Sequence, residues 1–184
     1  MIHDKTKEQH YREQYVTILT FDSTMLKEFD EVDARKRPKR KKKVLDWCGT
    51  KRLGMLPLIN KFLNVASRQQ QNQMKQQFHD YTKFILNKHN IDKSKLQRCG
   101  VIVKHYLPTR SKFDLDGVFV KASFDSLSDW GFWEDDNYTI VEPLFFTGGY
   151  DKENPRSEIQ IYEINEEYDR NFVLEIMKQE LESK

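Results

Sequence analysis

Aspartate residues are concentrated in one segment of the chain, where they lie between apolar residues. Asp114, Asp116, Asp125 and the adjacent pair Asp135–Asp136 fall within 23 residues. Carboxylates repel one another and lose free energy when they leave water, so a fold gathers them mainly where a cation needs them. The segment therefore predicts a site for a divalent metal ion.

The donors in this segment are oxygen atoms, which favours a hard cation. No spacing of Cys and His in the sequence suits zinc, and the five histidines are scattered. Mg²⁺ is therefore the expected ion, with Mn²⁺ as the alternative. Such an ion would stabilise charge on a bound phosphate and lower the pKa of an attacking water, and a nearby lysine could neutralise further charge.

The spacing of these residues indicates how they could come together. Asp114 and Asp116 are two residues apart, so an extended chain would place both side chains on the same face. Lys121 and Asp125 are four apart and would be neighbours on one face of a helix. The pair Asp135–Asp136 follows a Gly-Phe-Trp sequence, where the chain can turn back toward the first two aspartates.

Several of these residues also have a structural alternative. Asp114 or Asp116 could cap the N-terminus of a helix. Asp125 could form only an i,i+4 salt bridge with Lys121. Asp129 is expected to be solvated. The Asp-Leu-Asp-Gly string does not fit a calcium-binding loop, because its glycine is misplaced and no Glu follows at the twelfth position.

The elements that must position these residues follow from the apolar patterns. Strands are predicted at 15–21, 100–106, 138–146 and 157–164, and helices at about 116–128 and from 167 onward. A loop that leads into a further helix is predicted over about 55–90. Pro143 predicts an edge position or a bulge, residues 147–150 predict a turn, and 157–164 predict a half-buried antiparallel partner. The fold class is α+β, a single domain with a small mixed β-sheet flanked by helices.

Apolar residues at helical spacing mark the faces that should be buried. Met74, Phe78, Tyr81 and Ile85 form one such stripe, which is interpreted as core rather than as a binding groove. The stripes of the other two helices are Val120, Phe124 and Leu127, and Tyr168, Phe172, Ile176 and Met177.

The net charge of +2 hides a strong division along the chain. Residues 35–112 carry 21 basic and 3 acidic side chains, whereas residues 113–184 carry 6 basic and 18 acidic ones. Residues 35–43 hold eight basic side chains around Pro38, which predicts a flexible arm that contacts phosphates. A solvated insertion and a nuclear-localisation signal are the alternatives for this arm. The asymmetry indicates a polyanionic partner.

Length and composition suit one domain of three regions. These are residues 1–54 with the first strand and the basic insertion, a core over 55–164, and an amphipathic C-terminal helix over 165–184. The sequence has no apolar run long enough to cross a membrane and no secretory signal at residues 1–10. The two cysteines favour a reducing cytoplasm over a disulfide framework.

Residues 112–164 resemble the RusA family of Holliday junction resolvases, which are crossover junction endodeoxyribonucleases. That family shows D-x-D-N-x-x-K, then F/L-D-x-L, then a D-D pair before a strand. Here the corresponding runs are D-L-D-G-V-F-V-K, F-D-S-L and E-D-D-N. A weaker resemblance covers 55–90, where L-P-L-I-N-K is similar to the family's proline-asparagine loop.

The resemblance implies roles for individual residues. Asp114, Asp116 and Asp136 match the catalytic acids that hold the metal, and Lys121 matches the catalytic lysine. Asp125 and Asp135 match acidic positions of less defined role. Two departures are present: Gly117 stands at the usual Asn position, and one residue is inserted before Lys121. On a helix that insertion would rotate the lysine by about 100°.

The resemblance also implies a RusA-like fold, a homodimer and a four-way DNA junction as substrate, resolved with Mg²⁺ in DNA recombination and repair. A phage or prophage protein in a bacterial cytoplasm is expected. Two other classes of function stay open from the residues alone. One is a non-catalytic DNA-binding protein on the same fold, and the other is a protein-interaction module that uses the basic arm.

Overall fold

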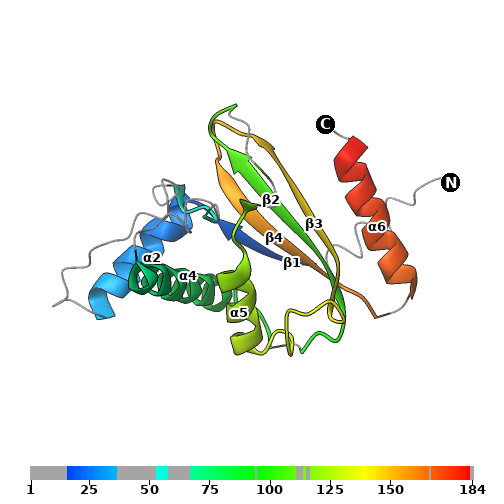
Figure 1. Cartoon of the computed structure of the whole chain (residues 1–184), viewed down its shortest axis with the longest axis horizontal. Helices are drawn as coiled ribbons and strands as arrows, with labels where there is room; N and C mark the ends of the chain where they lie inside the picture. Colours follow the sequence, from blue (N-terminus) through cyan, green and yellow to red (C-terminus); the bar gives the residue numbers. More distant parts are fainter. Residues whose placement is uncertain are drawn as a thin grey trace.

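The computed structural model describes residues 16–36, 53–57, 67–93, 95–110, 114, 117–165 and 167–182 (Figure 1). It is a single α+β domain with a mixed sheet, as predicted. The elements in chain order are β1 (Val16–Phe21), α2 (Ser23–Lys36), α4 (Arg68–Lys88), β2 (Cys99–Leu107), α5 (Lys121–Trp130), β3 (Val141–Tyr150), β4 (Arg156–Glu163) and α6 (Glu167–Glu182).

Within the ranges just given, four strands form one sheet in the order β1-β4-β2-β3. Strand β4 is antiparallel to both of its neighbours, and β2 is parallel to β3. The prediction of an antiparallel strand at 157–164 is confirmed, but the strand is central and most of it is buried rather than half-buried. Its central position follows from its apolar residues, which lie on both faces of the sheet.

Strand β3 is an edge strand and also contains a bulge, whereas Pro143 predicted one or the other. The register shifts between Cys99 and Val101, opposite the segment that contains this proline. The predicted turn at 147–150 is wrong, because these residues continue the pairing with β2 as far as Leu107 and Tyr150. The chain turns afterwards, where the Asp151 carboxylate accepts a hydrogen bond from the Asn154 amide at 3.0 Å.

Helices cover both faces of the sheet (Figure 1). The larger core lies between the sheet and α2, α4 and α5, and contains Phe21, Phe78, Tyr81, Leu127 and Trp133. The smaller core lies under α6, where Ile102 and Tyr162 of the sheet meet Val173, Ile176 and Met177. Burial of the predicted stripe on α4 is confirmed.

Helix α2 was not predicted, although its start carries a recognisable signal. The Asp22 carboxylate accepts a hydrogen bond from the Met25 amide at 2.8 Å, which is a helix N-cap contact. Leu26 and Phe29 are buried at helical spacing. The helix extends through Arg35 and Lys36, so the first two residues of the basic run are helical. The rest of the predicted arm, 37–43, lies outside the described residues.

Helix α5 begins at Lys121 rather than at 116. The Phe119 amide donates a hydrogen bond to the Pro57 carbonyl at 2.8 Å, and Val118 is buried, so the chain before Lys121 is tied to the 53–57 segment instead of coiling. Strand β3 likewise begins at Val141 rather than at 138, because a turn over 137–141 precedes it. No helix of the described part is long and apolar enough to cross a membrane.

Candidate active site

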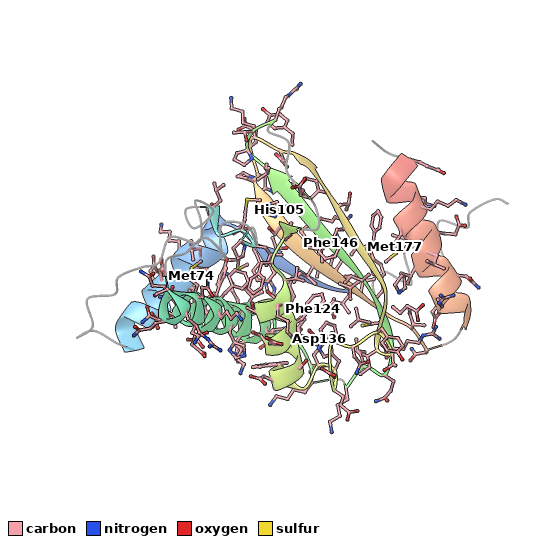
Figure 2. All side chains as sticks on the ribbon, viewed as in Figure 1. Met74, His105, Phe124, Asp136, Phe146 and Met177 are labelled. Atoms are coloured by element: carbon pink, nitrogen blue, oxygen red, sulfur yellow. The ribbon has the colours of Figure 1, made fainter. Side chains whose placement is uncertain are left out.

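The ammonium group of Lys121 lies between two carboxylates. Its Nζ is 2.6 Å from Oδ1 of Asp125 and 3.1 Å from Oδ2 of Asp136. Lys121 and Asp125 are one turn apart on α5, whereas Asp136 belongs to the loop before β3, which Figure 2 shows beside α5. The hydrogen bond to Asp125, and then that to Asp136, raises the pKa of Lys121 despite partial desolvation. The lysine is therefore cationic at neutral pH.

Lys121 occupies the first position of α5, where a positive charge is unfavourable. The N-terminus of a helix carries partial positive charge and prefers acidic side chains. The first turn of α5 holds no acid, and its N-cap residue, Val120, makes no side-chain cap hydrogen bond. A Lys that precedes its Asp partner by four residues is also the less favourable order for a helical ion pair. Helix stability therefore does not explain the placement of Lys121.

The late start of α5 resolves the question of spacing. The residue that the resemblance to the RusA family counts as inserted lies before the helix, since the helix begins at Lys121 itself. The insertion therefore does not rotate the lysine around the helix axis, and the expected displacement of about 100° does not apply. Contact with Asp136 is made in spite of the inserted residue.

The end of α5 directs the chain back toward Lys121. Gly131 has φ +81°, the left-handed conformation that ends many helices. Its amide donates to the Ser128 carbonyl at 2.9 Å, and the Phe132 amide donates to the Leu127 carbonyl at 3.0 Å. These two hydrogen bonds form a Schellman motif. The turn predicted after α5 is therefore present, and it brings Asp136 to Lys121. The predicted return toward Asp114 and Asp116 stays a prediction.

Buried aromatic residues anchor the segment between this reversal and Asp136. Trp133 is 1% exposed, and its indole N–H donates to the Ser128 hydroxyl at 2.8 Å. Its ring packs edge-on against Phe124 of α5, with centroids 5.4 Å apart. The Leu96 amide donates to the Phe132 carbonyl at 2.8 Å, which ties the segment to the chain before β2. Asp136 therefore follows a fixed piece of backbone.

Asp135 is occupied by its own turn. One of its carboxylate oxygens accepts from the Asp136 amide at 2.9 Å, and the other from the Asn137 side chain at 3.0 Å. The Asn137 side-chain oxygen accepts in turn from the Thr139 amide at 2.9 Å. The hydrogen bond from Asn137, followed by that from the Asp136 amide, lowers the pKa of Asp135. Asp135 and Asn137 thus order the turn that presents Asp136, a role for Asn137 that the sequence did not predict.

Asp114 is exposed, and its carbonyl accepts a hydrogen bond from the Gly117 amide at 3.0 Å. It does not cap α5, whose N-cap residue is Val120. Asp116 lies outside the described residues. The joint placement of Asp114, Asp116 and Asp136 therefore stays a prediction. Pro57 was not predicted to approach this region, but its hydrogen bond to Phe119 places the 53–57 segment beside the chain that leads to Lys121.

The remaining aspartates of the segment have partners. The i,i+4 salt bridge of Asp125 with Lys121 is confirmed. The expectation that Asp129 is only solvated is wrong, because it lies 2.9 Å from Nε2 of His79 and 3.4 Å from Nζ of Lys83. Slight desolvation opposes these contacts, but the His79 hydrogen bond and the Lys83 charge prevail and lower the pKa of Asp129. Asp129 therefore links α5 to α4.

The residues present are chemically suited to a hard divalent cation. Oxygen donors are what Mg²⁺ and Mn²⁺ prefer, and a cationic group, the Lys121 ammonium, already lies against Asp136. Over the ranges the structure describes, which leave out Asp116, no three His, Cys, Asp or Glu side chains are grouped closely enough to hold a metal ion. Among the described carboxylates, Asp136 contacts Lys121 from outside α5.

No protein-family model and no curated protein matches the sequence.

Proposed function

We propose that the protein is a Mg²⁺-dependent, structure-selective endodeoxyribonuclease that resolves four-way DNA junctions by phosphodiester hydrolysis, in recombination and repair. The observation that carries the proposal is the 3.1 Å contact between Lys121 and Asp136. It joins the lysine and the last acid of the RusA-like motif, which are 15 residues apart in the sequence. That the two lie together supports a common site for the motif's residues.

Asp114, Asp116 and Asp136 are the residues that would hold the metal. When bound, Mg²⁺ supplies charge stabilisation at the scissile phosphate and makes a bound water more acidic. Lys121 is cationic and its side chain is 55% exposed. Its ammonium is therefore accessible to DNA and can donate a hydrogen bond to a phosphate oxygen. That hydrogen bond would strengthen as negative charge builds in the transition state.

The charge distribution supports DNA as the polyanion. The site segment is acidic and repels a phosphate backbone on its own, whereas residues 35–112 carry a large excess of Lys and Arg. These basic residues would bind the backbone and the branched shape, with base sequence secondary. A homodimer would supply two sites related by a two-fold axis, as two symmetric nicks require. Such a substrate fits a phage or prophage protein acting in a bacterial cytoplasm.

Cleavage of a synthetic four-way junction tests the proposal. With Mg²⁺ or Mn²⁺, wild-type protein should introduce paired, symmetric nicks, and it should leave a linear duplex of the same arm sequence intact. Asp136→Asn should lower the cleavage rate by at least about 100-fold while junction binding persists, because the substitution removes a carboxylate and not the basic surface.

Three other outcomes would contradict the proposal and separate its rivals. Junction binding that weakens with salt, without nicks in either metal, would indicate a non-catalytic DNA-binding protein. Absence of salt-sensitive DNA binding would favour a protein-interaction module. Full cleavage activity in Asp136→Asn, and also in Asp116→Asn, would show that the acids assigned here do not carry the reaction.

A further inference from the structure

The carboxylate of Asp125 is the closest partner of the Lys121 ammonium, at 2.6 Å, and it is not needed to hold α5 together. The pair is exposed, with side-chain exposures of 55% for Lys121 and 49% for Asp125. Exposed ion pairs of this kind contribute little to stability. Both charges also stand in the order that the helix dipole disfavours. The pair therefore calls for an explanation other than folding.

Lys121 is shared between Asp125 and a second carboxylate of different surroundings. Asp136 is only 19% exposed and comes from another element, whereas Asp125 follows Lys121 on the same helix face. If a divalent cation occupies Asp136, Coulomb repulsion drives the ammonium away from that carboxylate. A lysine with one remaining partner would stay near its present position, and a lysine with none would be released into solvent.

We infer that Asp125 is a positioning residue, which holds the ammonium of Lys121 beside the metal site once Asp136 is engaged by the metal. The inference rests on the proposed function and adds a role for an acid that the motif leaves undefined. In this role the Asp125 carboxylate binds the Lys121 ammonium and contacts neither the metal nor the substrate. Its loss should therefore affect the rate of the reacting complex more than junction affinity.

The test compares three variants of α5 in the junction-cleavage assay. Asp125→Asn should lower the rate at saturating junction by about 10- to 100-fold, since a small misplacement of a catalytic group has an effect of that size. The junction concentration for half-maximal rate should change less than about threefold. Asp125→Glu, which can still pair with Lys121, should recover most of the rate.

Asp129→Asn is the matched control. Asp129 lies one turn further along the same helix and is paired with His79 and Lys83 instead of with Lys121. The Asp129→Asn variant removes the same charge from α5 but leaves the partners of Lys121 in place. Its cleavage rate should therefore stay within about twofold of wild type. Equal losses in Asp125→Asn and Asp129→Asn would attribute the effect to net charge or helix stability and overturn the inference.

A double-mutant cycle separates this inference from the proposed function. In a Lys121→Gln background, Asp125→Asn should add no further loss, because the residue acts through the lysine. A further loss of tenfold or more would show that Asp125 acts directly, as a ligand or base. Cleavage by wild type with an unaffected Asp125→Asn variant overturns only the inference, whereas absence of cleavage by wild type overturns the proposed function.

Discussion

Lys121 shows how the demands of the site and of the helix differ at a single residue. Its charge opposes the helix dipole, while its two ion pairs offset that cost. The two effects are each below about 1 kcal/mol for exposed groups. They therefore nearly cancel, and activity and stability should respond differently to its replacement.

Replacement of Lys121 by Gln should lower junction cleavage by about 100-fold, through loss of a charged hydrogen-bond donor. The free energy of unfolding, measured in urea, should change by less than about 1 kcal/mol. Lys83→Gln is the control, since Lys83 is partly exposed and is also paired with an aspartate on α5. A Lys121→Gln variant that cleaves normally would remove the lysine from the mechanism.

His105 is a buried residue that makes the stability of the protein depend on pH. It lies on β2 with Nδ1 2.7 Å from the Ser157 hydroxyl, which also accepts a hydrogen bond from the Leu56 amide at 3.0 Å. Burial lowers the pKa of His105 to about 4, below its ordinary value of 6.5. The unfolded chain therefore takes up this proton first as the pH falls.

The contribution of His105 to stability is fully present above about pH 6.5 and is lost as the pH falls toward 4. Between pH 7 and pH 5 the loss should be on the order of 2 kcal/mol, measured by urea unfolding. His105→Gln should be less stable at pH 7 and should lose less stability over the same interval. Parallel pH profiles for the two proteins would contradict this prediction.

Among the elements, the turn that ends α5 links helix stability to the site. Apart from its chain neighbours, no described residue has an atom within 4 Å of the position a Cβ on Gly131 would take, so the cost of a side chain there is conformational rather than steric. Gly131→Ala should destabilise the protein by about 1–2 kcal/mol because of its left-handed backbone. Thermal unfolding measures this cost.

Gly131→Asn provides the comparison for that substitution, because Asn tolerates the left-handed conformation better than Ala. It should be destabilised less than Gly131→Ala, and its cleavage rate should fall less, since Asp136 depends on this turn for its position. Equal stability of the alanine variant and wild type would show that the turn relaxes without cost.

Local sequence patterns predicted those elements whose boundaries depend only on residues nearby in the sequence. Strand β1 and helix α4 follow from short apolar patterns, and the edge position of β3 follows from Pro143. The parallel pairing of β2 with β3 was not predictable in this way, since it depends on how α5 crosses between them. The start of α5 also depends on a contact between distant segments, because the 53–57 segment binds the residues that precede the helix. The sequence prediction of this start was therefore wrong.

The candidate site was predictable in its residue types and only partly in its geometry. Acids and a lysine at motif spacing indicated a site, and the reversal after α5 indicated that Asp136 returns toward the earlier residues. The hydrogen-bonded role of Asn137 and the approach of Pro57 depend on contacts between distant segments. No periodicity in the sequence encodes such contacts.

At the scale of the whole molecule, the separation of charge predicts a strong response to ionic strength. Junction affinity should fall linearly with salt on logarithmic axes, with a slope of about 0.9 per phosphate contacted. Neutralising the Lys and Arg residues of 37–43 should reduce that slope without abolishing cleavage at low salt. Fluorescence anisotropy with a labelled junction measures the slope, and an unchanged slope would exclude this run from DNA contact.

The central position of β4 determines when the sheet can be completed while the chain is being synthesised. Strand β1 is made early, yet its sheet partner is β4, which is made after every other strand. Strand β2 also needs β4 on one side. Pairings so distant in sequence form slowly. We therefore expect that the sheet cannot be completed on the ribosome until Glu163 has left the exit tunnel, and that β1 stays without its partner strand until then.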